Sequence, residues 1–450
     1  MNVATQHPFL TRPRRTVLAL TLPVVISQIA EPLTGLVDTA FVARLGAPPL
    51  AALGVGGSAI SLLLWTFYFL GISTMTEVAQ AFGRGQLARV RQITSLGLLL
   101  AGAAGVLMLL AGLLGPHLLA RFLGAAPEVH DLAVTYIRVR LLGAPAVLLT
   151  MVGFGALRGL QDMRTPLRVA VVVNVINILL ALPFIYGLGP LPALGVAGAA
   201  LASVIAQYLG LAMLMLQLRR RPGLGWYFDR EDILQLLRAG RDLVVRSGLL
   251  TVFLLLSTRV ANQIGPEAGA AHQAMRTLWL FGSWLSDAFG TSAQSLVGYF
   301  LGAAQLRQAR RAAAVTILQG LATGVALCLL CLLATSLVRE VFVPPEAAAT
   351  FNSAWLVAAL TLPLAALAFV TDGIHWGTGD YPWLRNGMIF STGIAAVLLL
   401  LTDTAAPQAF LLVWLALFLW LALRSLFGLL RIWPGHVRAP LRHMRVPEPA

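Results

Sequence analysis

The sequence contains little charge and almost no cysteine. Asp, Glu, Lys and Arg make up 11% of the 450 residues, and every residue in the Lys and Arg count is an arginine. The two cysteines, Cys328 and Cys331, lie in an apolar segment. We interpret them as small core residues rather than as a redox or metal pair. The motifs GxxxxGK[ST], HExxH and GxSxG are absent, which excludes a P-loop pump within this chain. We therefore expect neither an enzyme nor a resident cofactor or metal.

The composition is instead typical of a membrane protein. The apolar fraction is 58%, and residues 93–113, 195–216 and 410–430 are apolar runs of about twenty residues each. A helix that rises ~1.5 Å per residue needs about 20 such residues to cross a ~30 Å hydrocarbon core. The sequence therefore predicts an all-α integral membrane protein.

Charged residues and Gly/Pro-rich segments divide the chain into about twelve expected helices. Several of them exceed the minimum length of a span, which predicts tilt or extension beyond the bilayer. The expected ranges are 17–45, 50–80, 93–122, 132–158, 166–187, 194–218, 244–264, 269–299, 311–338, 348–376, 385–402 and 408–431.

The arginines alternate between loops and so predict the orientation. They gather in residues 12–15, 84–91, 158–168 and 219–238, whereas the alternate loops 188–194 and 265–268 carry none. We expect a multi-pass protein of the bacterial inner (cytoplasmic) membrane. The positive-inside bias predicts that both of its termini lie in the cytoplasm. The net charge of +14 belongs to these loops. A solvated loop surface or contact with anionic lipid headgroups explains this charge, whereas nucleic-acid binding does not, because the charge is dispersed.

The two halves of the sequence repeat each other. Residues 39–91 align without a gap to residues 258–310, and 12 of the 53 aligned positions are identical. We expect two six-helix lobes, at 1–218 and 244–450, related by a pseudo-two-fold axis along the membrane normal. Residues 219–243, which include Trp226, Tyr227 and Phe228 among charges, are expected to form an amphipathic cytoplasmic linker.

The first expected span contains two acids. Charges at bilayer depth are costly, so each is a functional candidate. Glu31 and Asp38 lie two helical turns apart on one face, with Pro32 between them to bend the helix. A carboxylate that faces the bundle interior can take a proton from one side of the membrane and release it to the other. The alternative is a structural carboxylate that is permanently hydrogen-bonded to neighbouring helices.

Neutral polar residues in two further spans can contact such a carboxylate. Asn174 and Asn177 lie three apart in the fifth span, and Ser203 lies in the sixth. Their side chains can hydrogen-bond a carboxylate or coordinate a cation through oxygen. Two asparagines on a helix can equally serve as interhelical contacts.

The second half differs in its chemistry. Ser257 stands at the position equivalent to Asp38, and the half has Arg259 and Asp287 in its own spans. Asp287 is a candidate cavity residue, but an ion pair with Arg259 or Arg276 would make it structural.

Asp372 and His375 lie one turn apart in the tenth span. They are candidates for coupled titration, unless His375 is solvated at the cytoplasmic end of the helix.

Aromatic residues suggest the lining of a cavity for an apolar substrate. The candidates are Trp65, Phe67, Trp279 and Trp284, to which Phe281 can be added. Aromatic residues in membrane bundles more commonly serve in packing or as interfacial anchors, so this second interpretation stays open.

Several segments resemble the MATE (multidrug and toxic compound extrusion) family, most closely its DinF-like branch. The resemblance covers essentially the whole chain in order. Its segments are EPLTGLVDTA at 31–40, RLG at 44–46, AQAFG at 79–83, LRGLQD at 157–162, NVIN at 174–177 and GVAGAALAS at 195–203.

The resemblance implies a polyspecific exporter that exchanges protons or sodium for amphiphilic, often cationic compounds. It assigns the coupling carboxylate to Asp38, with Asn177 and Ser203 beside it. Many relatives carry a second acid four residues after the Asn, where this chain has Ala181. A single carboxylate suits a proton better than a hard cation, which prefers several oxygen ligands.

We therefore predict a proton-coupled multidrug efflux antiporter that acts as a monomer among membrane lipids on small amphiphilic molecules. A sodium-coupled antiporter is the first alternative. A flippase for lipid-linked oligosaccharide is the second, because Arg138, Arg140, Arg259 and Arg276 could line a cationic cavity. A membrane-embedded transferase would need a catalytic pair such as Asp372 and His375.

Overall fold

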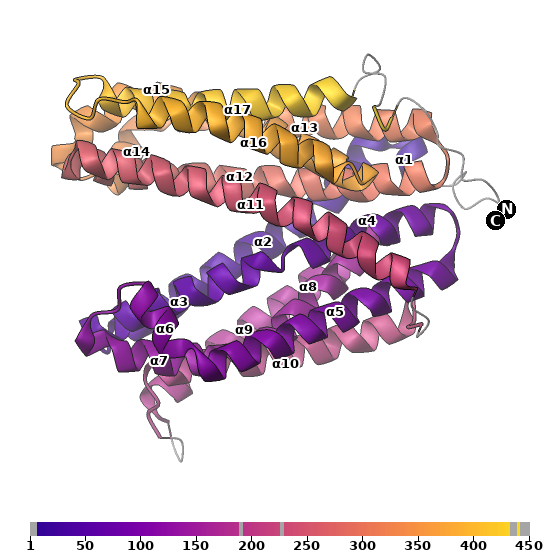
Figure 1. Cartoon of the computed structure of the whole chain (residues 1–450), viewed down its shortest axis with the longest axis horizontal. Coiled ribbons are helices and arrows are strands. Elements are labelled where there is room, and N and C mark those ends of the chain that lie inside the picture. Colours follow the sequence, from indigo (N-terminus) through magenta and orange to yellow (C-terminus); the bar gives the residue numbers. More distant parts are fainter. Residues whose placement is uncertain (1–6, 189–191, 226–228, 433–438, 442–450) are drawn as a thin grey trace. The chain divides into compact units, whose positions relative to one another are not determined.

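A computed structural model describes residues 7–188, 192–225, 229–432 and 439–441, which fold into helices and connecting turns (Figure 1). The expected all-α membrane architecture is confirmed. The elements are α1 (Pro8–Thr11), α2 (Pro13–Ala43), α3 (Ala47–Thr66), α4 (Phe69–Gly83), α5 (Leu87–Leu114), α6 (Pro116–Phe122), α7 (Pro127–Leu141), α8 (Ala144–Gly159), α9 (Arg164–Tyr186), α10 (Val196–Arg220), α11 (Arg230–Ile264), α12 (Pro266–Gly302), α13 (Leu306–Leu333), α14 (Thr335–Phe342), η2 (Pro345–Ala347), α15 (Ala348–Thr378), α16 (Tyr381–Leu400) and α17 (Ala409–Ile432).

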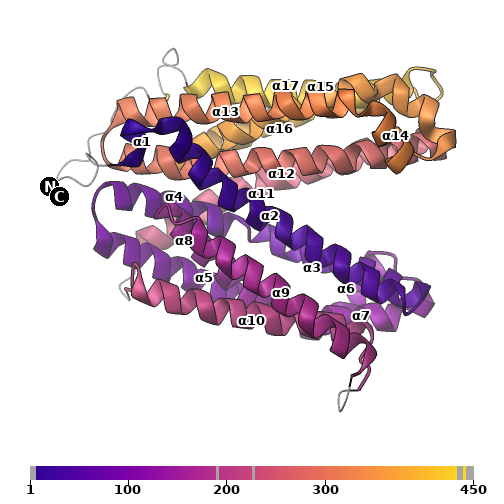
Figure 2. The ribbon, with the colours of Figure 1, turned by 180° about the vertical axis from the view of Figure 1, so that it is seen from behind.

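The helices form two compact units. The N-terminal unit consists of residues 22–82 and 86–240, and the C-terminal unit consists of residues 1–21, 83–85 and 241–450. Within the N-terminal unit α9 and α10 lie side by side, as α15 and α17 do within the C-terminal unit (Figures 1 and 2). In the predicted linker, α10 ends at Arg220 and α11 begins at Arg230. Trp226, Tyr227 and Phe228 lie outside the described residues.

The expected spans correspond to these helices, with some breaks. Ten helical segments in the described part of the chain are long and apolar enough to cross a membrane, and α7 with α8 forms an eleventh, bent by 47°. The expected span 93–122 ends early because Gly115 and Pro116 separate α5 from α6. The expected span 311–338 likewise divides into α13 and α14.

Helix α12 is long enough to span but is not among these apolar segments. Residues 288–300 of this helix are all buried inside the C-terminal unit, including Thr291, Gln294 and Ser295. Because protein rather than lipid surrounds this part of α12, polar side chains cost less there.

The two repeats fold in the same way. Gly46 and Gly265, which are equivalent positions, have φ of 111° and 155° and directly precede α3 and α12. Such positive φ values favour glycine. Proline lies in the first turn of both helices, where its missing N–H is not needed. The repeat therefore places the same helix start in each half.

Close backbone contacts also recur at equivalent positions: Gly71 aligns with Gly290 in the gapless repeat, and Gly155 aligns with Gly373 at a spacing of 218 residues. A Cβ atom on Gly155 would lie 2.3 Å from the carbonyl oxygen of Gly71, and one on Gly373 would lie 2.0 Å from that of Gly290. The first pair joins α4 to α8 in the N-terminal unit, and the second joins α12 to α15 in the C-terminal unit. Close helix approach at small residues is typical of membrane bundles. These matched contacts confirm that the chain is a structural duplication.

Replacing Gly373 with alanine is therefore expected to lower the free energy of unfolding of the C-terminal unit by about 1–3 kcal/mol, because the helices must separate. The matched control is Gly393→Ala on α16, where no atom lies within 4 Å of the added methyl group. The control should be neutral or slightly stabilising, since alanine favours helix. Unfolding in mixed detergent micelles measures both, and equal stabilities would contradict the prediction.

Candidate functional site

Helix α2 carries the acid that sequence analysis singled out. Two prolines, Pro23 and Pro32, lie inside this helix, and each removes a backbone hydrogen bond and favours a bend. Asp38 follows Pro32 by less than two turns, and only 9% of its surface is exposed. Thr34 and Val42, one turn before and after it, are also buried. Asp38 therefore lies on the packed face of α2.

Asp38 meets α9 and α10 through an asparagine and a serine. Asn177 of α9 and Ser203 of α10 are buried, with 3% and 7% exposure. In the amide orientation that satisfies both neighbours, the Asn177 NH₂ group donates to Asp38 Oδ1 at 3.2 Å. The Asn177 carbonyl oxygen then accepts from the Ser203 backbone N–H at 3.2 Å and from its hydroxyl at 2.7 Å. In the opposite amide orientation, the Asn177 carbonyl oxygen would face Asp38 Oδ1, and both atoms are acceptors.

A positive charge lies close to this carboxylate. Arg140 of α7 interacts electrostatically with Asp38, and its Nη1 donates to Gln207 Oε1 at 2.8 Å. Tyr136, one turn earlier on α7, packs so closely on α3 that a Cβ atom on Gly56 would lie 2.2 Å from its ring. Among the side chains that the structure describes, the site therefore contains one acid, one nearby base and neutral hydrogen-bonding groups.

The remaining predicted coupling residues differ in position. Asn174 is half-buried on α9, and the side chain of Glu31 lies outside the described residues, although its backbone is part of α2. Ala181, where many relatives of the resembled family carry a second acid, is completely buried one turn after Asn177. The structure thus brings together Asp38, Asn177 and Ser203 of the five predicted residues.

The predicted cavity aromatics belong to separate units, so their common role stays a prediction. In the N-terminal unit, Trp65 is 61% exposed and Phe67 is half-buried. In the C-terminal unit, Trp284 is half-buried, whereas Trp279 is 3% exposed and packs in the apolar core. The burial of Trp279 favours the packing role that sequence analysis left open.

The predicted polar residues of the C-terminal unit are also spread out. Arg259 is exposed and Asp287 is half-buried on α12. Arg276 donates to Gln273 at 3.4 Å. An ion pair of Asp287 with either arginine stays a prediction.

Two of the arginines considered for a flippase lie in the N-terminal unit. Arg138 lies 3.2 Å from His117 at an exposed position, whereas Arg140 donates to Gln207. The two guanidinium groups therefore have different partners.

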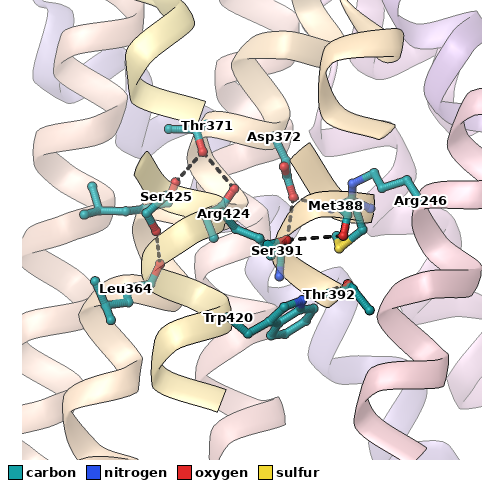
Figure 3. A network of polar contacts seen from close by, with 12 residues as sticks. Arg246, Leu364, Thr371, Asp372, Met388, Ser391, Thr392, Trp420, Arg424 and Ser425 are labelled. Carbon is teal, nitrogen blue, oxygen red and sulfur yellow. Dashed lines mark hydrogen bonds and ion pairs between the residues drawn. The ribbon is translucent and has the colours of Figure 1, made fainter. Parts of the chain in front are cut away.

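A buried charge cluster occupies the C-terminal unit (Figure 3). Asp372 of α15 accepts hydrogen bonds from Arg246 of α11 and from Arg424 of α17, both on Oδ2, and the Arg424 contact measures 2.8 Å. All three residues are at most 6% exposed. The Arg424 guanidinium also lies over the ring of Trp420 at 4.6 Å, and that of Arg246 lies over Trp376 at 5.1 Å. Cation–π contacts of this kind stabilise desolvated arginines.

His375 is not solvated, so that interpretation of the sequence was wrong. It has no exposed surface, because α17 covers it, and its Nε2 hydrogen-bonds to the Gly428 carbonyl oxygen at 3.0 Å. Its Nδ1 lies 3.7 Å from Asp380, which accepts from Arg431 Nε at 2.7 Å. The partners of Asp372 are therefore arginines rather than His375.

Sequence analysis missed Arg246 and Arg424. Arg424 stands within the apolar run 410–430, and an arginine in the middle of a membrane span is itself a sign of a buried partner. Arg246 lies near the start of the seventh expected span, where an arginine is a weaker sign of a buried partner.

Comparison with protein families finds one model that matches both halves. The MatE model matches residues 23–182 and residues 243–401, which are segments of nearly equal length. The match to the same model twice agrees with the duplication.

Related proteins occur in bacteria and plants. The chain is 31% identical over 445 residues to DNA damage-inducible protein F of Escherichia coli, covering 96% of this chain and 94% of that protein. It is 30% identical over 442 residues to the chloroplastic protein DETOXIFICATION 44 of Arabidopsis thaliana, covering 92% and 81%.

A solved transporter of the MOP superfamily from Pyrococcus furiosus shares the fold. Its TM-score is 0.83 at 23% identity, over 93% of this chain and 96% of that one.

Proposed function

The chain belongs to the MatE family of multidrug and toxic compound extrusion transporters, and from this membership we propose that it is a proton-coupled antiporter that exports amphiphilic, often cationic compounds. The observation that carries the proposal is the buried carboxylate of Asp38, held by the neutral side chains of Asn177 and Ser203.

The hydrogen bonds around Asp38 favour a proton over sodium. A hard cation prefers several oxygen ligands. The Asn177 amide turns its NH₂ group toward Asp38, while its oxygen is engaged by Ser203. The position of a second acid is occupied by the methyl group of Ala181. A single carboxylate beside an N–H donor suits a proton, which binds to one oxygen atom, better than it suits sodium, which needs several oxygen ligands.

Protonation of Asp38 would change this hydrogen bonding. As a carboxylate, Asp38 accepts from Asn177; once a proton has arrived from outside, the charge is lost and that charge-assisted bond weakens. Helix α2 then shifts at Pro32, the cargo leaves, and the proton is released to the cytoplasm. For an uncharged cargo, moving one proton through 100 mV supplies about 2.3 kcal/mol, enough for roughly fiftyfold accumulation.

The orientation and the division of the chain follow as parts of this proposal. We place the protein in the inner membrane of a bacterium with both termini in the cytoplasm, because the arginine-rich segments alternate with arginine-free ones. Residues 1–218 and 244–450 act as the two moving lobes, and residues 219–243 connect them. The transporter works as a monomer.

Imposed gradients in proteoliposomes test the coupling ion. A pH gradient without sodium should drive dye export, whereas a sodium gradient at equal pH on both sides should not. The matched variant is Ala181→Asp, which supplies a second carboxylate one turn from Asn177 and should add sodium-driven export. Sodium-driven export by the unaltered protein would refute proton coupling.

A further inference from the structure

The buried cluster of the C-terminal unit holds more positive than negative charge. Arg246 and Arg424 share the single carboxylate of Asp372, so the trio carries one excess positive charge in a site with at most 6% exposure. An uncompensated buried charge is costly, because the protein interior solvates it far less well than water does.

Neighbouring acids do not balance this charge, because arginines already pair with them. The nearby ion pairs in the described residues are Asp242 with Arg241 and Arg385, and Asp380 with Arg431.

Both guanidinium groups of the cluster also retain an unused N–H. Arg424 Nη1 and Arg246 Nε are buried and have no hydrogen-bond partner among the residues that the structure describes. The faces of Trp420 and Trp376 attract the cations but do not replace an acceptor for these hydrogens. Leaving a buried donor without an acceptor is energetically unfavourable, because the donor has lost its hydrogen bonds to water.

A small cavity adjoins Arg424. It has room for about one water-sized particle. Asp372, Arg424 and Met388, which belong to its lining, appear together in Figure 3. The rest of the lining comes from α16 and α17, namely Trp383, Leu384, Gly387, Phe427 and Gly428.

We propose that this cavity binds one small monovalent anion of the halide class, which in a cell is chloride, against the Arg424 guanidinium. A halide neutralises the excess charge and accepts the unused Nη1 hydrogen. A water molecule would supply an acceptor without neutralising the charge, and a halide, as a single atom, is much smaller than a phosphate or a lipid phosphodiester. The bound anion stabilises the packing of α15, α16 and α17, independently of Asp38 and of the coupling ion.

Binding of radioactive chloride to the purified full-length protein in detergent tests this site. We expect saturable binding that approaches one chloride per chain. Arg424→Gln should abolish it. Gly387→Ala keeps all three charges, and its methyl group would lie 3.4 Å from Phe427 Cβ, an accommodated contact that narrows the cavity. This variant should weaken chloride binding about tenfold. Gly393→Ala on the same helix faces open space and should bind as the unaltered protein does.

Several outcomes would overturn the proposal. Non-saturable binding by the unaltered protein would mean an adventitious ion only, and equal binding by folded Gly387→Ala and Gly393→Ala would place the ion elsewhere. Competition distinguishes a free halide from a lipid headgroup as the bound anion. Bromide should displace chloride, whereas displacement by phosphatidylglycerol but not by bromide would identify a lipid headgroup and overturn the proposal. Because Gly387→Ala retains the ion pairs, a folding failure of Arg424→Gln does not decide the result.

Discussion

Replacing Asp38 with asparagine should reduce pH-driven dye export in proteoliposomes to the background of empty vesicles. The two side chains are nearly equal in size, and an asparagine can still accept a hydrogen bond from the Asn177 NH₂ group. It cannot gain and lose a proton in the physiological range, so the free energy of the proton gradient no longer reaches the transport cycle. The loss should appear in export rate, while dye binding measured by fluorescence should change little.

The repeat offers a matched control at Ser257. This residue occupies the position in the second half that Asp38 occupies in the first, and it is completely buried, with its hydroxyl bonded to the Leu254 carbonyl oxygen at 2.9 Å. Ser257→Ala should therefore leave the response to pH intact. Persistent pH-driven export by Asp38→Asn, or equal loss in both variants, would show that coupling does not depend on this carboxylate.

Much of the architecture was predictable because membrane spans impose strong local rules. Apolar runs of sufficient length indicated the helices. Aligned glycines such as Gly71 and Gly290 marked positions at which helix backbones approach each other closely. The boundaries were less predictable where a helix breaks at a Gly-Pro pair, as at Gly115.

The two charged sites differ in how far sequence could reveal them. Asp38, Asn177 and Ser203 could be proposed together because a family resemblance linked them. Their hydrogen bonds, including the direction of the Asn177 amide, depend on how α2, α9 and α10 pack. Arg246 and Arg424 lie 126 and 52 residues from Asp372. Spacing along the chain therefore favoured His375 as its partner, although the contacts between α11, α15 and α17 decide the pairing.

The exposed acid Glu340, on α14 of the same unit, provides the control for a test of this cluster. Glu340→Gln removes a solvated charge and should alter the free energy of unfolding by less than about 0.5 kcal/mol.

Asp372→Asn, by contrast, should lower the free energy of unfolding by about 3–5 kcal/mol, because it leaves two buried guanidinium groups without a carboxylate. Adding Arg424→Gln to Asp372→Asn removes one of those charges, so the double variant should be more stable than the sum of the single losses predicts. Denaturation in mixed micelles of a mild detergent and dodecyl sulfate gives the free energy of unfolding of all four proteins in this double-mutant cycle: the unaltered protein, the two single variants and the double variant. Strict additivity would mean that Asp372 and Arg424 do not stabilise each other. The amount by which the double variant exceeds the additive expectation should be measured in gluconate and in a saturating halide. If this excess stability is smaller in the halide, a bound anion takes over part of the role of the missing carboxylate.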